Sequence, residues 1–161
     1  MTLANTLRQK LSEWRPAGQG RHTLAVTDES GWTAVLTADR QDQIGCVLWE
    51  VTLRRPDATS NDPLPALRAW ADRTAKNVKG LLERLRVVEV DATRREALLR
   101  SDVPAERDDS VAYYEILLKG SSQAIVQRYQ GSTTGQRRTQ IPFTLTHEVV
   151  AQLAEDIALA P

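Results

Sequence analysis

Two stretches of the sequence, VLWEVTLRR at residues 47–55 and AYYEILLKG at residues 112–120, carry nearly the same pattern of side chains. β-Branched and aromatic residues are typical of strands, whose successive side chains point to opposite faces of a sheet. Both stretches are therefore predicted to be sheet strands, and their similarity indicates an internal repeat. The matched residues are Trp49, Glu50, Val51, Leu53 and Arg54 in the first stretch, and Tyr114, Glu115, Ile116, Leu118 and Lys119 in the second.

The similarity extends upstream of both stretches at a nearly constant separation. Upstream the separation is 63 residues, whereas Trp49 and Tyr114 are 65 residues apart, which indicates a short insertion in the second copy. A set of identities this small also arises in shuffled sequences, so duplication and coincidence both remain open. The upstream matches are Asp28, Ala34, Leu36 and Asp39 with Asp91, Ala97, Leu99 and Asp102.

Turn-forming clusters divide the chain into elements in the order α-βββ-α-ββββ-α. Apolar residues at helical spacing predict helices over 3–14, 63–85 and 146–159, and Asp62 is the expected N-cap of the second. The fold class is therefore α+β, with an antiparallel sheet of about six to eight strands and three helices mainly on one face. A chain of 161 residues is expected to form a single domain, 1–161, with repeat halves 1–55 and 62–130 and a C-terminal helix at 146–159. The predicted strands are 21–27, 31–39, 43–55, 86–91, 96–101, 110–120 and 123–130.

Strict alternation assigns the side chains of the two repeated strands to two faces. One face is wholly apolar and should lie under the helices, with Val47, Trp49, Val51 and Leu53 from the first strand and Ala112, Tyr114, Ile116 and Leu118 from the second. The other face carries one carboxylate in each copy, and a buried unpaired carboxylate is costly, so this face is expected to meet water. It is either a dimer or partner surface or is covered by a helix or loop. The candidate partner or dimer residues are Leu48, Glu50, Tyr113, Glu115 and Leu117.

Composition limits the compartment and the partners. Lysine plus arginine and aspartate plus glutamate both number 21, so no net charge draws the whole molecule to nucleic acid or to an anionic membrane. Cys46 is the only cysteine, which fits a reducing compartment, and the N-terminus lacks the hydrophobic stretch of a signal peptide. We expect a cytoplasmic protein without a membrane anchor.

The order helix, three strands, helix, several strands, helix resembles the fold of the type III secretion chaperones and their non-secretory relatives. The resemblance covers most of the chain but only as element order, and no motif carries a family residue onto this sequence. It implies a small homodimeric module that binds an extended segment of a protein client. Two features differ from that family. Its chaperones are typically acidic whereas this chain is neutral, and this chain has an extra strand before the last helix.

No catalytic, metal or cofactor motif is recognised, and a non-enzymatic protein is expected. His22 and His147 lack a second ligand at metal spacing, and Cys46 alternates with apolar residues in a strand, which favours a core position over a nucleophile. The alternative function is an anion or nucleic-acid binder that uses clustered arginines. Three arginine pairs are the candidates for it: Arg54 and Arg55, Arg94 and Arg95, and Arg137 and Arg138.

Overall fold

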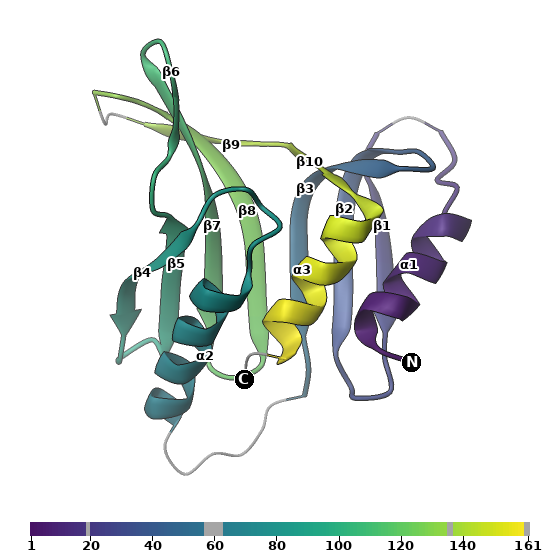
Figure 1. Cartoon of the computed structure of the whole chain (residues 1–161), viewed down its shortest axis with the longest axis horizontal. Helices are drawn as coiled ribbons and strands as arrows, with labels where there is room; N and C mark the ends of the chain where they lie inside the picture. Colours follow the sequence, from purple (N-terminus) through teal and green to yellow (C-terminus); the bar gives the residue numbers. More distant parts are fainter. Residues whose placement is uncertain (19, 57–62, 135–136, 160–161) are drawn as a thin grey trace.

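The computed structural model describes residues 1–18, 20–56, 63–134 and 137–159, so the predicted N-cap Asp62 lies outside the described residues. The helices and strands of this part follow the predicted order (Figure 1). The helices are α1 (Leu3–Glu13), α2 (Pro63–Asn77) and α3 (His147–Leu159). The strands are β1 (His22–Thr27), β2 (Thr33–Gln41), β3 (Gly45–Arg54), β4 (Leu85–Asp91), β5 (Glu96–Ser101), β6 (Ala105–Arg107), β7 (Ser110–Lys119), β8 (Gln123–Ser132), β9 (Arg138–Ile141) and β10 (Phe143–Thr146).

The strands form one antiparallel sheet in the order β1-β2-β3-β8-β7-β5-β4. The short strands β6, β9 and β10 extend it by pairing with β7, β8 and β3. The predicted α+β class with an antiparallel sheet is confirmed, and the strand count exceeds the expected range because of these three strands. Each has only three or four residues, which is too short for a recognisable alternation of polar and apolar side chains.

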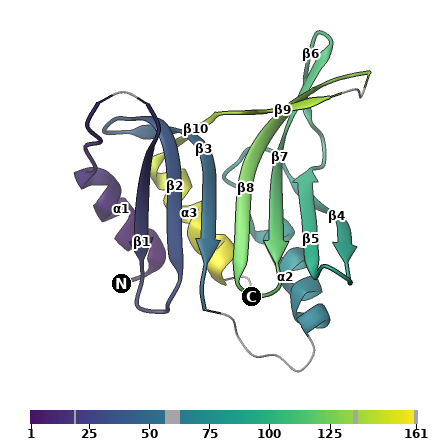
Figure 2. The ribbon, with the colours of Figure 1, turned by 180° about the vertical axis from the view of Figure 1, so that it is seen from behind.

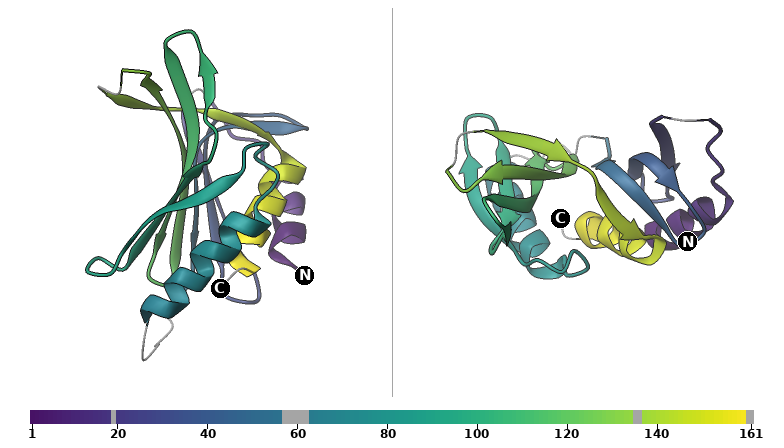
Figure 3. Two further views of the ribbon diagram at one scale, coloured as in Figure 1. Left: turned by 60° about the vertical axis from the view of Figure 1, so that its left-hand side comes forward. Right: turned by 90° about the horizontal axis from the view of Figure 1, so that it is seen from above.

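All three helices lie on one face of the sheet, as the side and top views show (Figure 3). We call this the helix face, and the opposite one the open face. The core lies between the helices and the helix face, and it includes the indole of Trp70, whose Nε1 donates to the carbonyl of Ile157 at 2.9 Å. Seen from behind, none of the three helices in the described part of the chain lies on the open face (Figure 2).

The strand pairings of the two predicted repeat halves correspond position by position. In the first half Ala34 on β2 pairs with Leu53 on β3, and in the second Ala97 on β5 pairs with Leu118 on β7. All four side chains are fully buried. The sequence similarity therefore coincides with an equal strand register, and β8 lies between β3 and β7 as the central strand.

A β-bulge at Trp49 ends this correspondence. Thr37 pairs with Glu50 and the next pair is Ala38 with Leu48, so Trp49 is passed over in the ladder. An extra residue reverses the faces of every residue on its N-terminal side. Leu48 consequently lies in the core with 0% exposure, and Trp49 lies half-buried on the open face. The prediction that Leu48 belongs to the open face is wrong for this reason.

Residues beyond the bulge follow the predicted alternation. Glu50 and Thr52 lie on the open face, while Val51 and Leu53 are buried under the helices. In the second copy, β7 pairs with β8 without an irregularity, and Tyr114 remains on the helix face as predicted. The two aromatic residues of the repeated pattern thus lie on opposite faces.

Helix α2 is shorter than its apolar pattern predicted. It ends at Asn77 rather than near Leu85, which already belongs to β4. In the loop that follows, Leu82 adopts a positive φ of 63°, and its side chain is 96% exposed. The loop still buries Val78 and Leu81, which explains why the apolar spacing continued past the helix end.

Candidate functional site

An apolar row crosses the middle of the open face. Its five residues lie next to one another on β2, β3, β8, β7 and β5, since each pairs with the next across the ladder. All are half-buried although no helix covers them. The row consists of four aliphatic residues, Val35, Ile125, Leu117 and Leu98, together with Thr52 of β3.

A polar row runs beside the apolar row and contains both repeat carboxylates. Glu115 pairs with Gln127 of β8, and the Gln127 amide Nε2 donates to Oε1 of Glu50 at 2.8 Å. The central strand therefore separates two carboxylates that occupy equivalent positions in the two halves. Both lie on the face predicted for them, but their surroundings differ.

Glu115 is held by two arginines, and each arginine lies over a tyrosine ring. Its Oε1 accepts from Arg100 Nε and from an Arg138 terminal nitrogen, both at 2.7 Å. The Arg138 guanidinium lies 3.9 Å from the ring centre of Tyr129, and that of Arg100 lies 5.4 Å from Tyr113. We call these five residues the Glu115 cluster. The Glu115 side chain is 8% exposed, whereas Arg100 and Arg138 are 38% and 42% exposed, so both cations reach the surface.

Two members of the Glu115 cluster, Arg138 and Tyr129, have raised pKa values. Burial opposes the charged form of Arg138, but hydrogen bonds to Tyr113 and Glu115 outweigh it and raise the arginine pKa. Burial likewise raises the pKa of Tyr129, although Arg138 lowers it in part. Tyr129 thus keeps its proton, which its hydroxyl donates to Oε1 of Gln127 at 2.7 Å.

Trp49 forms a second group on the open face. Its indole Nε1 donates to Asp39 at 2.5 Å, and the guanidinium of Arg21 lies 4.1 Å from its ring centre. Arg21 also pairs with Asp39 at 3.5 Å. The Gln140 amide donates to the backbone carbonyl of Trp49 at 2.8 Å, which ties β9 to β3. Sequence alternation missed this group because it assigned Trp49 to the core.

The paired arginines do not form one cluster. Arg55 donates from Nε to the carbonyl of Ser121 at 3.0 Å, and the carbonyl of Arg95 accepts from Gly120 N at 2.8 Å, so two of the pairs lie around the β7–β8 turn. The third pair lies at the other end of β8, where Arg138 pairs with Gly131.

Several of these arginines already have partners. Arg94 lies 4.0 Å from the carboxylate of Asp91, and Arg55 lies 4.9 Å from the ring centre of Trp32. Arg138 belongs to the Glu115 cluster, while Arg54 and Arg137 are exposed. The convergence of all three pairs on one anion, which the alternative function required, is therefore not present in the structure.

Cys46 and the two histidines have structural partners. The thiol of Cys46 and Nε2 of His147 contact the same Gln41 Oε1 at 2.8 and 3.0 Å. Burial, with a smaller effect of Asp42, raises the pKa of the Cys46 thiol to about 11, so the thiol stays protonated at neutral pH. His22 contacts the carbonyl of Gly18 at 3.4 Å.

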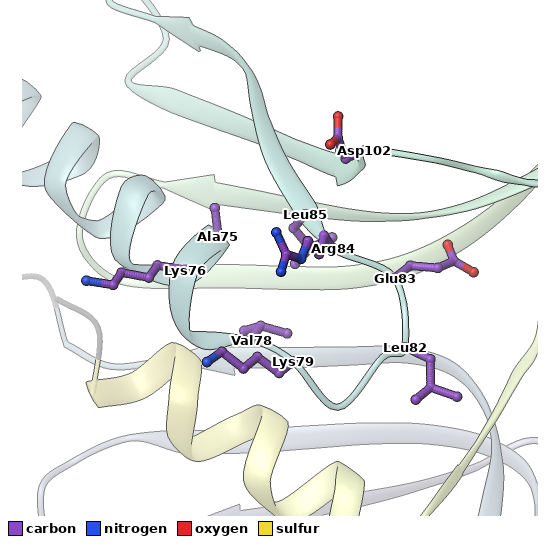
Figure 4. Close-up of a pocket in the computed structure, with 9 residues that line it drawn as sticks. All are labelled: Ala75, Lys76, Val78, Lys79, Leu82, Glu83, Arg84, Leu85 and Asp102. Carbon is purple, nitrogen blue, oxygen red and sulfur yellow. The ribbon is translucent and has the colours of Figure 1, made fainter.

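A hollow of about 640 Å³ lies on the helix side, between the end of α2 and the start of β4 (Figure 4). Leu82 and Glu83 belong to the loop that lines it. The Glu83 carboxylate is engaged, since it accepts from Ser101 Oγ at 2.6 Å and pairs with Arg128 at 3.1 Å.

Among the described residues, no helix is long and apolar enough to cross a membrane, and no group of three or more metal-ligating side chains is present. Comparisons with protein-family models, with curated proteins and with solved structures found no match.

Proposed function

We propose that this chain is a non-catalytic protein-binding module whose open face holds a segment of a partner protein. The observation that carries the proposal is the composition of that face. Tyrosine, tryptophan and arginine are the residues most enriched at the energetic centres of protein interfaces. Here Tyr113 and Tyr129 lie beside Arg100 and Arg138, and Trp49 lies beside Arg21, on the face that also carries the apolar row and that none of the described helices covers.

The chemistry of the face indicates the kind of segment that fits. The apolar row would bury apolar side chains of the partner. Each guanidinium carries five N–H donors, and the bonds of Arg100 and Arg138 to Glu115 use only one donor each. Both cations are therefore positioned to bind a carboxylate of the partner. The expected segment combines apolar side chains with an acidic one.

A nucleic acid is a weaker candidate for the same face. Its arginines alternate with the carboxylates of Asp39, Glu50 and Glu115, and the whole chain has no net charge. A phosphate backbone needs an excess of positive charge along its path. The resemblance to secretion chaperones in element order agrees with a protein client, but the proposal rests on the open face. Since Cys46 is a free, buried cysteine, the compartment we propose is the cytoplasm.

The test is selection from a phage-displayed library of random peptides on the immobilised protein. We expect enriched peptides that combine apolar residues with aspartate or glutamate. Leu117→Ala and Arg100→Ala should each weaken their binding about tenfold, as expected for central interface residues. The matched controls are Leu82→Ala and Arg68→Ala, which remove the same side chains from exposed positions on the helix side. The controls should bind like the unmodified protein.

Two results would overturn the proposal. The first is a selection in which no peptide is enriched over a surface without protein. The second is a set of enriched peptides that bind Leu117→Ala and Arg100→Ala as tightly as they bind the two controls. Binding that weakens steeply with salt and is competed by single-stranded RNA would favour the nucleic-acid alternative instead.

A further inference from the structure

The two repeat carboxylates have equivalent positions in the sheet but different neighbours across the ladder. Glu115 pairs with Arg100 of β5, whereas Glu50 pairs with Thr37 of β2. Thr37 and Arg100 are 63 positions apart (100 minus 37), which is the separation of the upstream matches between the two halves. The first half therefore has a threonine at the position where the second half supplies an arginine to its carboxylate.

Glu50 has a neutral partner in place of that arginine. Its Oε1 accepts from the Gln127 amide at 2.8 Å, and none of the ion pairs in the described part of the chain includes Glu50. The orientation of Gln127 is fixed, because its Oε1 accepts from the Tyr129 hydroxyl at 2.7 Å. The Glu50 carboxylate is thus held in place while no cation of the described chain pairs with it.

The β-bulge places an aromatic ring next to this carboxylate. Trp49 and Glu50 are consecutive, yet both lie on the open face because the ladder passes over Trp49. Bulges redirect side chains in this way beside binding sites. Arg21 lies over the indole, but it pairs with Asp39 rather than with Glu50. A carboxylate beside an aromatic side chain is suited to binding a cation.

A partner on the open face would remove the remaining water from Glu50. The side chain is already half-buried, and Thr52, two positions along on the same face, belongs to the apolar row. A segment that buries the apolar row therefore also covers Glu50. Removing water from an unpaired carboxylate is costly, and a cation placed against it offsets that cost. Glu50 consequently favours segments that bring a cation to this position and disfavours those that do not.

We propose that Glu50 binds a lysine or arginine side chain of the partner segment, which supplies the charge that Arg100 supplies to Glu115. This inference rests on the proposed function and specifies the partner further, because the segment then carries a basic residue as well as an acidic one. The two carboxylates lie on either side of β8, two strand spacings or about 10 Å apart. An extended segment advances about 3.3 Å per residue, so its basic and acidic residues should be about two to four positions apart.

Peptide selection on matched variants tests the inference. A phage-displayed library of random peptides is selected on the unmodified chain, on Glu50→Gln and on Thr37→Arg, which supplies the missing cation from the chain itself. The control Thr33→Arg adds the same charge to the same strand and face, opposite Arg54. The unmodified chain and the control should enrich peptides with a basic and an acidic residue at the expected spacing. Glu50→Gln and Thr37→Arg should still enrich apolar and acidic residues but not the basic one.

A double-mutant cycle measures the proposed contact. A peptide enriched on the unmodified chain is synthesised again with its basic residue replaced by glutamine. On the unmodified chain this replacement should weaken binding about fivefold to tenfold, as expected for one partly buried ion pair. On Glu50→Gln the same replacement should change binding by less than about twofold, because the contact is already absent.

The inference is wrong in two cases. In the first, the unmodified chain enriches apolar and acidic residues without a basic one, and the proposed function still stands. In the second, the basic residue is enriched equally on Glu50→Gln and Thr37→Arg, which would mean that it binds elsewhere on the face. A selection that enriches no peptide on any of these proteins would instead refute the proposed function, and the inference with it.

Discussion

Removal of Glu115 should destabilise the fold more than removal of Glu50, its counterpart in the first repeat half. Glu115 is buried at 8% exposure and accepts charge-assisted hydrogen bonds from Arg100 and Arg138, both at 2.7 Å. Glu115→Ala leaves two guanidinium groups next to each other without the carboxylate that separates them. Glu50→Ala removes an acceptor only from the neutral amide of Gln127.

The magnitude follows from the exposure of the partners. A hydrogen bond to a charged group contributes about 1.5–3 kcal/mol when buried. Arg100 and Arg138 are 38% and 42% exposed, so water and salt replace part of that contribution in the variant. We therefore expect Glu115→Ala to lower the free energy of unfolding by about 2–4 kcal/mol. Glu50→Ala should lower it by about 0.5–1.5 kcal/mol.

Urea denaturation followed by tryptophan fluorescence gives both free energies. A second substitution sharpens the test, because Arg100→Ala in the Glu115→Ala background removes an uncompensated cation and should recover part of the lost stability. Equal losses for Glu115→Ala and Glu50→Ala would refute the reasoning. They would mean that the two arginines do not depend on Glu115 for their positions.

Two further predictions concern β3. Leu48→Ala should lower the free energy of unfolding by about 2–5 kcal/mol and Val47→Ala by less than about 1 kcal/mol, because only Leu48 lies in the core; the reverse order would disprove the bulge at Trp49. The raised pKa of Cys46 means that the folded state holds the thiol proton more tightly than the unfolded state. The protonated thiol therefore contributes to the free energy of unfolding in full below about pH 8.5, and this contribution is lost as the pH rises through about 11. Urea titrations from neutral to alkaline pH should therefore show a steeper loss of stability for the unmodified chain than for Cys46→Ala, and parallel curves would contradict the burial of the thiol.

The element order could be predicted because it depends on local signals. Turn clusters such as DESG and DRQD mark hairpin ends, and alternating β-branched residues mark the strands between them. The match of Ala34 and Leu36 with Ala97 and Leu99 also anticipated the equal register of the two halves. Short strands such as β9 escaped prediction because long-range pairing, rather than local pattern, defines them.

The errors on β3 have one physical cause. Alternation assigns faces correctly only while the ladder is regular, and a single bulge reverses every assignment on one side of it. Nothing in the sequence around Trp49 distinguishes a bulged strand from the regular strand around Tyr114. Alternation therefore predicts Leu48 on the open face and Trp49 in the core, whereas the structure places each on the opposite face.

The candidate site was anticipated in part. Tyr113, Glu115 and Leu117 lie on the predicted face, because β7 pairs with β8 in an unbroken register. The role of Arg138 was missed, since sequence spacing grouped it with Arg137 as an anion binder. Its contact with Glu115 depends on the pairing of β9 with β8, which brings residues 23 positions apart together.

The asymmetry between the two halves bears on how a partner segment would lie. Both halves place a carboxylate beside β8, but only the second surrounds it with arginines that reach the surface. A partner carboxylate would be attracted to the Arg100 and Arg138 side and repelled by Glu50 on the other side. The apolar row continues across both halves, so it would contact apolar side chains of the proposed partner at either end. Equal strand pairing places Glu50 and Glu115 at equivalent positions, but only Glu115 has arginines beside it. A segment with one acidic end would therefore bind in a single direction, with that end beside Arg100 and Arg138.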